Sequence, residues 1–184
     1  MPNIYVLLTR SQSLLSRMIH RLTGDSFTHV SLALDSQLQT LCSFARRYSH
    51  TPLPAGLVHE DLYSGYFDHH RYIPCRLYAL QLDEQKYENV SHSVQRMMEQ
   101  RTAYRYDIHG LIRCKLGMES NREKHFFCSM FVASVLYNAG ALDLPKTPSL
   151  MRPQDFARLV ELSCVYEGRL SGLMHDRTFD PHAT

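Results

Sequence analysis

One cysteine, Cys128, stands where its thiol could act as a nucleophile. It opens a stretch in which apolar residues recur at 131, 132, 135, 136 and 139, the spacing of a helix that ends near Gly140. The unpaired N–H groups and the positive dipole at a helix start favour the thiolate, which is the nucleophilic form. Cys128 also lies on the apolar stripe of this helix, and free cysteines are often simply buried. The position alone therefore leaves a nucleophile and a structural thiol open.

A thiol nucleophile needs a base to hold its proton, and His29 is the candidate. It opens an alternating segment, residues 29–35, that we interpret as a strand. His29 shares its face with small and polar residues, while valine and leucine side chains form the opposite face. A helix or a substrate could approach the imidazole on that polar side. On its own, His29 would more readily be an exposed histidine at a strand end.

The base in turn needs a partner that orients its ring. We expect a returning strand over residues 38–46 after a short turn near residue 36, which would bring Ser43 roughly opposite His29. The Ser43 hydroxyl could then fix the imidazole tautomer. Glu60 is the alternative partner, as a carboxylate able to stabilise an imidazolium. Both assignments stay open at this point.

Two further side chains are weaker candidates for binding or orienting a substrate. Tyr106 precedes a predicted helix, and its hydroxyl could line a cleft or help bind an oxyanion. Arg46 could bind an acidic substrate group, although a solvated strand end explains it as well. The histidines at 59, 69 and 70 lack carboxylate or cysteine neighbours at metal-ligand spacing, so we expect no metal and no cofactor.

Composition limits the classes of function. The chain has 184 residues, enough for one domain with a substantial core, and we expect a single domain with a flexible end of about 12 residues. A formal charge of +2 gives no argument for nucleic-acid binding. The five cysteines are scattered without a CxxC pair, and neither a secretion signal nor an integral membrane segment is evident. We therefore expect a reducing, cytoplasmic setting.

The elements that must position these residues follow from periodicity and turn signals. We expect strands over residues 3–9, 29–35, 38–46, 76–82 and 164–170. We expect helices over residues 11–23, 83–101, 107–116 and 153–160, besides the one that starts at Cys128. Residues 48–56 read as a loop, and 58–65 are ambiguous.

At several of these segments the chain resembles the circularly permuted papain-like cysteine hydrolases, relatives of the bacterial NlpC-type amidases. In that family the histidine strand precedes the cysteine helix. The similarity spans about residues 27 to 160, and it lies in Phe27–Asp35, Cys42–Arg47, Gly56–Glu60, Phe127–Val132, Leu144–Leu150 and Pro153–Phe156.

The resemblance implies an α+β papain-like fold in which an antiparallel sheet packs against helices that include the Cys128 helix. It also implies that Cys128 is the nucleophile, that His29 is the base, and that Ser43 takes the third position, where family members often carry His, Glu, Asn or Gln. The implied function is a cysteine-dependent hydrolase that cleaves an amide, peptide or ester bond through an acyl-enzyme.

Three alternatives share the same residues. An acyltransferase would differ only in which acceptor enters the second half-reaction. A catalytically silent binding domain would keep the fold and the cleft, and a plain scaffold would simply bury Cys128. The substrate could be a small molecule, a peptide or a lipid conjugate, and the sequence leaves the oligomeric state open.

Overall fold

The computed structural model describes residues 1–10, 24–46 and 55–175. Its main sheet has six strands in the order β4-β3-β2-β1-β5-β8, and all neighbours are antiparallel. These strands are β1 (Asn3–Thr9), β2 (His29–Ala33), β3 (Cys42–Arg46), β4 (Ala55–His59), β5 (Pro74–Gln81) and β8 (Ser163–Arg169). A second, parallel pair joins β6 (Arg105–Tyr106) to β7 (His125–Phe126).

Six α-helices surround the sheet in the described part of the chain. They are α2 (Gly65–His69), α3 (Glu84–Glu99), α4 (Ile108–Lys115), α5 (Cys128–Asn138), α6 (Pro153–Phe156) and α7 (Leu170–His175). Helices packed on an antiparallel sheet make the fold α+β in the general sense that the sequence indicates. Among the described residues, no helix combines the length and the apolar character needed to cross a bilayer.

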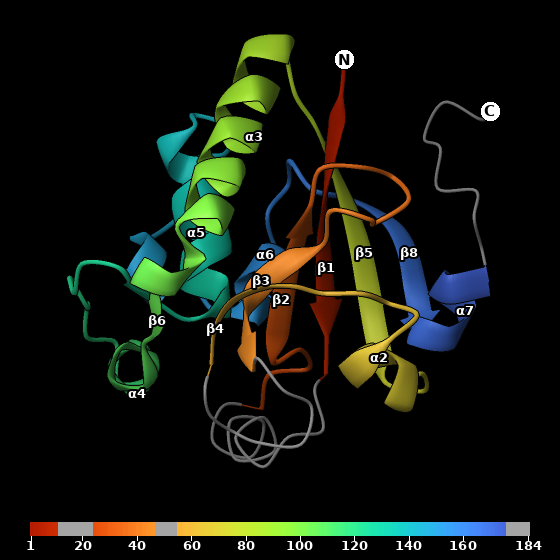
Figure 1. Ribbon diagram of the computed structural model, residues 1–184, viewed down its shortest axis with the longest axis horizontal. Coiled ribbons are helices and arrows are strands. Elements are labelled where there is room, and N and C mark those ends of the chain that lie inside the picture. The colour runs from red at the N-terminus through yellow and green to blue at the C-terminus, as the bar shows by residue number, and fades with distance from the viewer. Residues whose placement is uncertain (11–23, 47–54, 176–184) are drawn as a thin grey trace.

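The sheet separates two apolar cores. The α3 and α5 helices lie together on one side of the sheet, and α2 and α7 lie on the other (Figure 1). Alternate residues of β1 enter the two cores: Val6 joins the cluster that contains Phe131 of α5, whereas Leu7 joins the cluster that contains Phe67 of α2. A strand buried on both faces reads as a continuous apolar run, which is how residues 4–8 appear in the sequence.

The connection between β2 and β3 is longer than expected. Both strands are short, and residues 34–41 form a loop in which Asp35 accepts hydrogen bonds from the Gln39 and Thr40 N–H groups (3.0 and 2.8 Å). Leu32 pairs with Cys42, so Ser43 is aligned with Ser31 and not with His29. The expectation of a short turn that brings Ser43 opposite His29 is therefore wrong by two residues.

Other boundaries also differ from the sequence reading. The expected helix over 11–23 and most of the 48–56 loop lie outside the described residues. Within the ambiguous 58–65 segment, only the end of β4 is strand. The α2 and α7 helices and the β6–β7 pair were not predicted, and the helix expected over 153–160 ends at Phe156. Each missed element is short, and short elements depend on tertiary contacts more than on periodicity.

Candidate active site

His29, at the first position of β2, forms the centre of a buried polar cluster. Its Nε2 lies 3.0 Å from Oε1 of Glu60, and the two side chains are only 13% and 11% exposed. A carboxylate can only accept, so Nε2–H donates this hydrogen bond. The structure therefore joins a histidine and a glutamate that are 31 residues apart in the sequence.

Two serines complete the surroundings of the ring. The Oγ atoms of Ser31 and Ser43 each lie 3.3 Å from His29 Nε2, and both serines are fully buried. Ser31 also donates a hydrogen bond to Oε2 of Glu60. Ser43 reaches the ring diagonally across the β2–β3 pair. Of the two candidates for orienting His29, Glu60 is the closer and the charged one, and Ser43 supports it.

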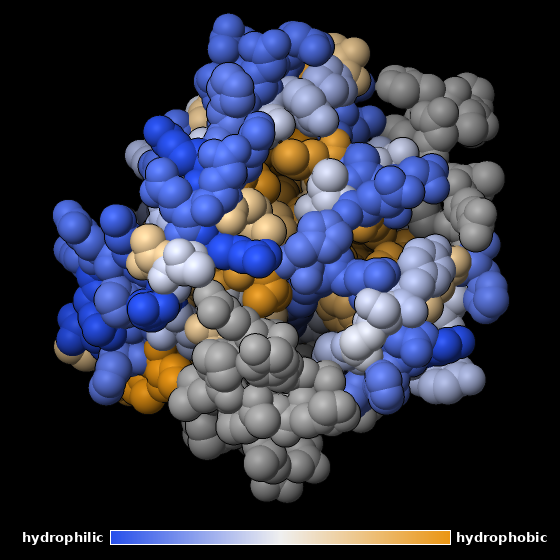
Figure 2. Space-filling view, in the orientation of Figure 1, coloured by the Kyte–Doolittle hydropathy of each residue, from blue (hydrophilic) through white to orange (hydrophobic). Residues whose placement is uncertain are grey.

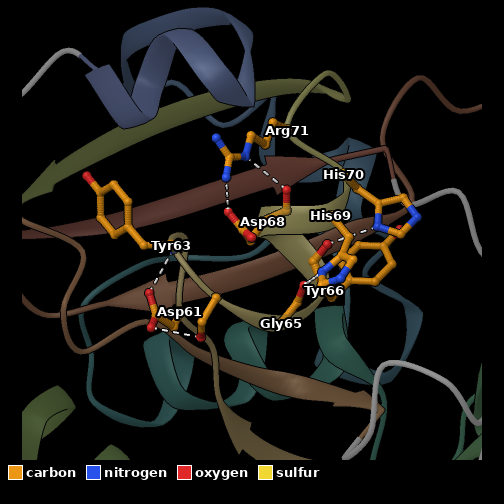
Figure 3. Close-up of polar contacts among 9 residues, drawn as sticks. Asp61, Tyr63, Gly65, Tyr66, Asp68, His69, His70 and Arg71 are labelled. Atoms are coloured by element: carbon orange, nitrogen blue, oxygen red, sulfur yellow. Dashed lines mark hydrogen bonds and ion pairs between the residues drawn. The ribbon is translucent and has the colours of Figure 1, made fainter.

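The backbone around Glu60 is held on both sides. Its N–H donates to the Leu41 carbonyl (2.7 Å), which extends the β3–β4 pairing by one residue. The next residue, Asp61, accepts hydrogen bonds from the Tyr63 N–H (2.8 Å) and the Ser64 hydroxyl (2.9 Å) in the turn that leads to α2 (Figure 3). This turn directs the chain away from the sheet immediately after the carboxylate, which fixes where the Glu60 side chain begins.

Burial and charge act in opposite directions on the His29–Glu60 pair. Burial lowers the pKa of His29, but the Glu60 charge and hydrogen bonds with Cys128 and Glu60 raise it well above its ordinary value. Burial likewise raises the pKa of Glu60, while the charge of His29 and hydrogen bonds within the cluster bring it below its ordinary value. An imidazolium facing a carboxylate is therefore the favoured state at neutral pH.

Cys128 approaches the same imidazole from α5. It is the first residue of that helix, it is 5% exposed, and its side chain lies close enough to the His29 imidazole to contribute to the raised pKa of that ring. No side chain caps the start of α5, where Phe127 is the N-cap. The positive end of the helix dipole is thus left for whatever group lies beside the thiol. At the other end, Gly140 takes the left-handed conformation (φ 65°) expected for it.

The β6–β7 pair holds Tyr106 beside the start of α5. Tyr106 pairs with Phe126, and the Asp107 N–H donates to the Phe126 carbonyl (2.9 Å). Burial, together with the charges of Cys128 and Asp107, raises the pKa of Tyr106, so its hydroxyl keeps its proton. Tyr106 therefore offers a hydrogen-bond donor next to the thiol.

A small pocket with a volume of about 20 Å³ opens beside the thiol. Its lining includes Thr28, Tyr106, Cys128, Ser129 and Arg152. The Ser129 hydroxyl is buried and has no hydrogen-bond partner among the described residues. The exposed lining of this pocket is mainly apolar, and the uncapped start of α5 supplies the backbone N–H groups that can bind a carbonyl oxygen as it becomes negative.

Three other cysteines are buried, and their thiols are less acidic than usual. Burial raises the pKa of Cys42 and of Cys75 to about 12, and that of Cys114 to about 11. Thiols with such values are almost wholly protonated near neutral pH. The fifth cysteine, Cys164, is exposed on β8.

The remaining candidates lie apart from this cluster or cannot be placed. The side chain of Arg46 is outside the described residues. The Nδ1 atoms of His69 and His70 bind the carbonyls of Gly65 (2.6 Å) and Tyr66 (2.9 Å) within their own turn, as Figure 3 shows. In the described ranges, no three side chains of the His, Cys, Asp or Glu type are grouped as metal ligands.

Sequence reasoning missed Ser31 and Ser129 as parts of the site. Strand alternation already placed Ser31 on the His29 face, but only the contact with Glu60 gives it a role. Ser129 follows the nucleophile candidate directly, and nothing in its spacing distinguishes it from an ordinary helix residue. No protein-family model matches the sequence, and no curated protein matches it.

Proposed function

We propose that this protein is a cysteine-dependent hydrolase of the permuted papain-like kind, which cleaves an amide, peptide or ester bond through an acyl-enzyme. One observation carries the proposal: the His29 imidazole is bound by the Glu60 carboxylate and lies beside Cys128, the first residue of an uncapped helix. The resemblance in the residues around both catalytic candidates supports the same reading.

The proton arrangement suits a thiolate–imidazolium pair. The Nε2 hydrogen is directed at Glu60, so Nδ1 is the nitrogen left to take the thiol proton. A raised imidazole pKa favours that transfer, because the ring holds the proton it receives. Glu60 thus acts as a positioning residue that also stabilises the imidazolium.

In the first half-reaction the Cys128 sulfur attacks the substrate carbonyl carbon, and the carbonyl oxygen becomes an oxyanion. The backbone N–H of Cys128 donates to that oxygen, and the Tyr106 hydroxyl is a second donor available in the pocket. The His29 imidazolium then protonates the leaving nitrogen or oxygen as its bond to carbon breaks, which leaves a thioester.

In the second half-reaction His29 takes a proton from water as the water oxygen attacks the thioester. The bond from carbon to sulfur breaks, the acid is released and the thiol is regenerated. An acyltransferase would use the same residues with another acceptor in place of water. The substrate class in either case is a small molecule, a peptide or a lipid conjugate with an accessible acyl group.

The proposal is tested by alkylation of the intact protein with iodoacetamide at about pH 6, where an ordinary thiol is mostly protonated. Labelling is read cysteine by cysteine from peptide masses. The exposed Cys164 is the internal control. We expect Cys128 to react faster than Cys164 although Cys128 is buried, and we expect this advantage to disappear in His29→Ala.

Two outcomes would contradict the proposal. Labelling of Cys164 with Cys128 unreactive in the folded protein would make Cys128 a structural thiol. A rate at Cys128 that is the same in His29→Ala would mean that the imidazole does not activate it. The first result would favour the plain scaffold, and the second would favour the silent binding domain.

A further inference from the structure

The α4 helix exposes an apolar stripe. Ile108, Ile112 and Leu116, which follow one another at intervals of four residues, are 41%, 52% and 69% exposed, and Met118 is 45% exposed. Six large aliphatic side chains are exposed among the described residues, and four of them lie within these 11 positions. Figure 2 shows orange atoms beside blue ones where Figure 1 places α4. Apolar residues grouped in this way mark a contact surface.

This stripe is not the side of α4 that packs on the protein. Leu111 and Cys114 form that side, in a buried cluster with Phe127 and Met130 at the start of α5. Most surface helices have one apolar face, which packs on the core. A second apolar stripe on the solvent side does not contribute to the core, so its exposure needs another explanation.

The segment of the chain that carries the stripe is basic. Residues 101–125 carry six lysines and arginines against three acids, a formal +3, whereas the whole chain carries only +2. Asp107, one of the three acids, is fully buried and bound to Arg122. Within α4, the exposed His109 and Arg113 run alongside the apolar row. Glu119 and Glu123 are the acids that remain at the surface.

We propose that α4 docks this face of the protein on an anionic lipid bilayer. The apolar row would enter the boundary between headgroups and acyl chains, while the neighbouring cations bind lipid phosphates. An apolar row with basic flanks on a helix lying along the surface is the arrangement expected of an interfacial helix. Docking uses the surface of α4 and not the thiol, so it goes beyond the proposed hydrolase and does not depend on it.

Docking would also bring the candidate active site close to the lipid. Leu111 and Lys115, on the inner side of the same helix, line the pocket beside Cys128. A helix with its side chains is about 10 Å across. The pocket would therefore lie roughly one helix diameter from the bilayer, within reach of an acyl group attached to a lipid.

The test is cosedimentation of the purified chain with vesicles of phosphatidylcholine, with and without phosphatidylglycerol. We expect binding to the anionic vesicles that weakens at high salt. The double variant Ile112→Ser, Leu116→Ser should bind at least about tenfold more weakly, because two apolar side chains no longer enter the lipid. The matched control is Tyr72→Ser, Val160→Ser, which removes side chains that are 71% and 92% exposed elsewhere; it should bind like the original chain.

Three results would overturn the proposal: no sedimentation with anionic vesicles, equal binding to both vesicle types, or full binding by the α4 double variant. Self-association that disappears in the double variant, without vesicle binding, would assign the stripe to a second copy of the chain. Melting temperatures check that each variant is folded. Cys128→Ser should bind vesicles normally, so failure of the hydrolase proposal and failure of docking are told apart.

Discussion

Three side-chain oxygen atoms surround Nε2 of His29, and they differ in how strongly they affect the pKa of the ring. Only Glu60 brings a full charge, and it is the closest at 3.0 Å. Replacing Glu60 by glutamine keeps the shape and removes the charge. We expect the pKa of His29 to fall in Glu60→Gln, because burial then acts with less opposition. NMR titration of the His29 ring measures this directly.

A comparison within the cluster separates charge from packing. Ser43→Ala removes an oxygen 3.3 Å from Nε2 and leaves the carboxylate in place. We expect its effect on the His29 titration and on Cys128 alkylation to be clearly smaller than that of Glu60→Gln. A larger effect from Ser43→Ala would make the serine the main orienting residue, as the sequence resemblance implies. Glu167→Gln, which disrupts a surface ion pair with Arg76, is the control for a general loss of charge.

The same pair makes stability depend on pH in two directions. The pKa of Glu60 is lowered from 4.5 in the folded protein, so its contribution is present above about pH 4.5 and is lost as pH falls through the folded value. The pKa of His29 is raised above 6.5, so its contribution is present below about pH 6.5 and is lost as pH rises through the folded value. Both contributions are complete between these limits.

Urea unfolding of Glu60→Gln against the original chain tests this window. We expect the variant to be less stable by about 1–3 kcal/mol between pH 5 and 6. The difference should shrink as pH falls, because the Glu60 carboxyl then becomes neutral in the original chain as well. A difference that stays constant down to acid unfolding would mean that lost packing, and not lost charge, destabilises the variant.

At the scale of elements, the first turn of α4 leaves no room for a side chain at Gly110. A Cβ there would lie 2.2 Å from Oδ2 of Asp107. That carboxylate is held by the Gly110 N–H (2.9 Å), the Ser120 hydroxyl (3.1 Å) and Arg122 (3.0 Å), so it cannot easily move. The steric clash is therefore with a fixed group.

Gly110→Ala should for this reason destabilise the protein by about 1–3 kcal/mol. In an ordinary helix interior the same change stabilises by roughly 1 kcal/mol. The free energy of unfolding from urea titration decides the sign. His92→Ala, at an exposed position of α3, is the control and should stay within about 0.5 kcal/mol of the original chain. A stabilised Gly110→Ala would show that the Asp107 cluster rearranges readily.

Elements with strong local signals were predictable from the sequence. The β1 strand matches its expected range, and Asp83 and Asp107 cap α3 and α4 by accepting from the Lys86 and Gly110 N–H groups. The loop after β2 was not predictable, because Asp35 folds it through hydrogen bonds to backbone several residues ahead. A residue such as Leu38, with φ 56°, also gives no sign in the sequence of its left-handed conformation.

The candidate site shows the same limit. The alternating pattern predicted that His29 and Ser43 lie close together on neighbouring strands. The structure does bring them together, although the predicted register was wrong by two residues. The sequence could not show whether Ser43 or Glu60 does more to orient the His29 ring. That depends on where β4 ends and on how far the Glu60 side chain reaches. Side-chain reach across two strands is a property of the assembled sheet, and it has no pattern along the chain.

At the scale of the whole molecule, only one of the two apolar cores includes residues of the helix that begins at Cys128. Phe131 lies one turn after Cys128 and packs against Phe44 of β3 (5.4 Å between ring centroids), whereas Phe67 lies in the other core. Phe131→Leu and Phe67→Leu should each cost about 1–3 kcal/mol. Only Phe131→Leu should slow alkylation of Cys128 in the folded protein. Equal slowing in both variants would mean that the sheet transmits the change from one core to the other.

The central place of β1 has a consequence for synthesis of the chain. Its two hydrogen-bonding edges are filled by β2 and by β5, and the β5 residues that pair with it come 66 to 78 positions later in the sequence. At about 5–20 residues per second, the ribosome leaves that edge open for roughly 3 to 15 seconds. During this time five consecutive apolar residues, Ile4–Leu8, lie on an unpaired strand, which is the form in which nascent chains associate with one another. One edge of β1 therefore stays open to association with other chains until β5 has been synthesised.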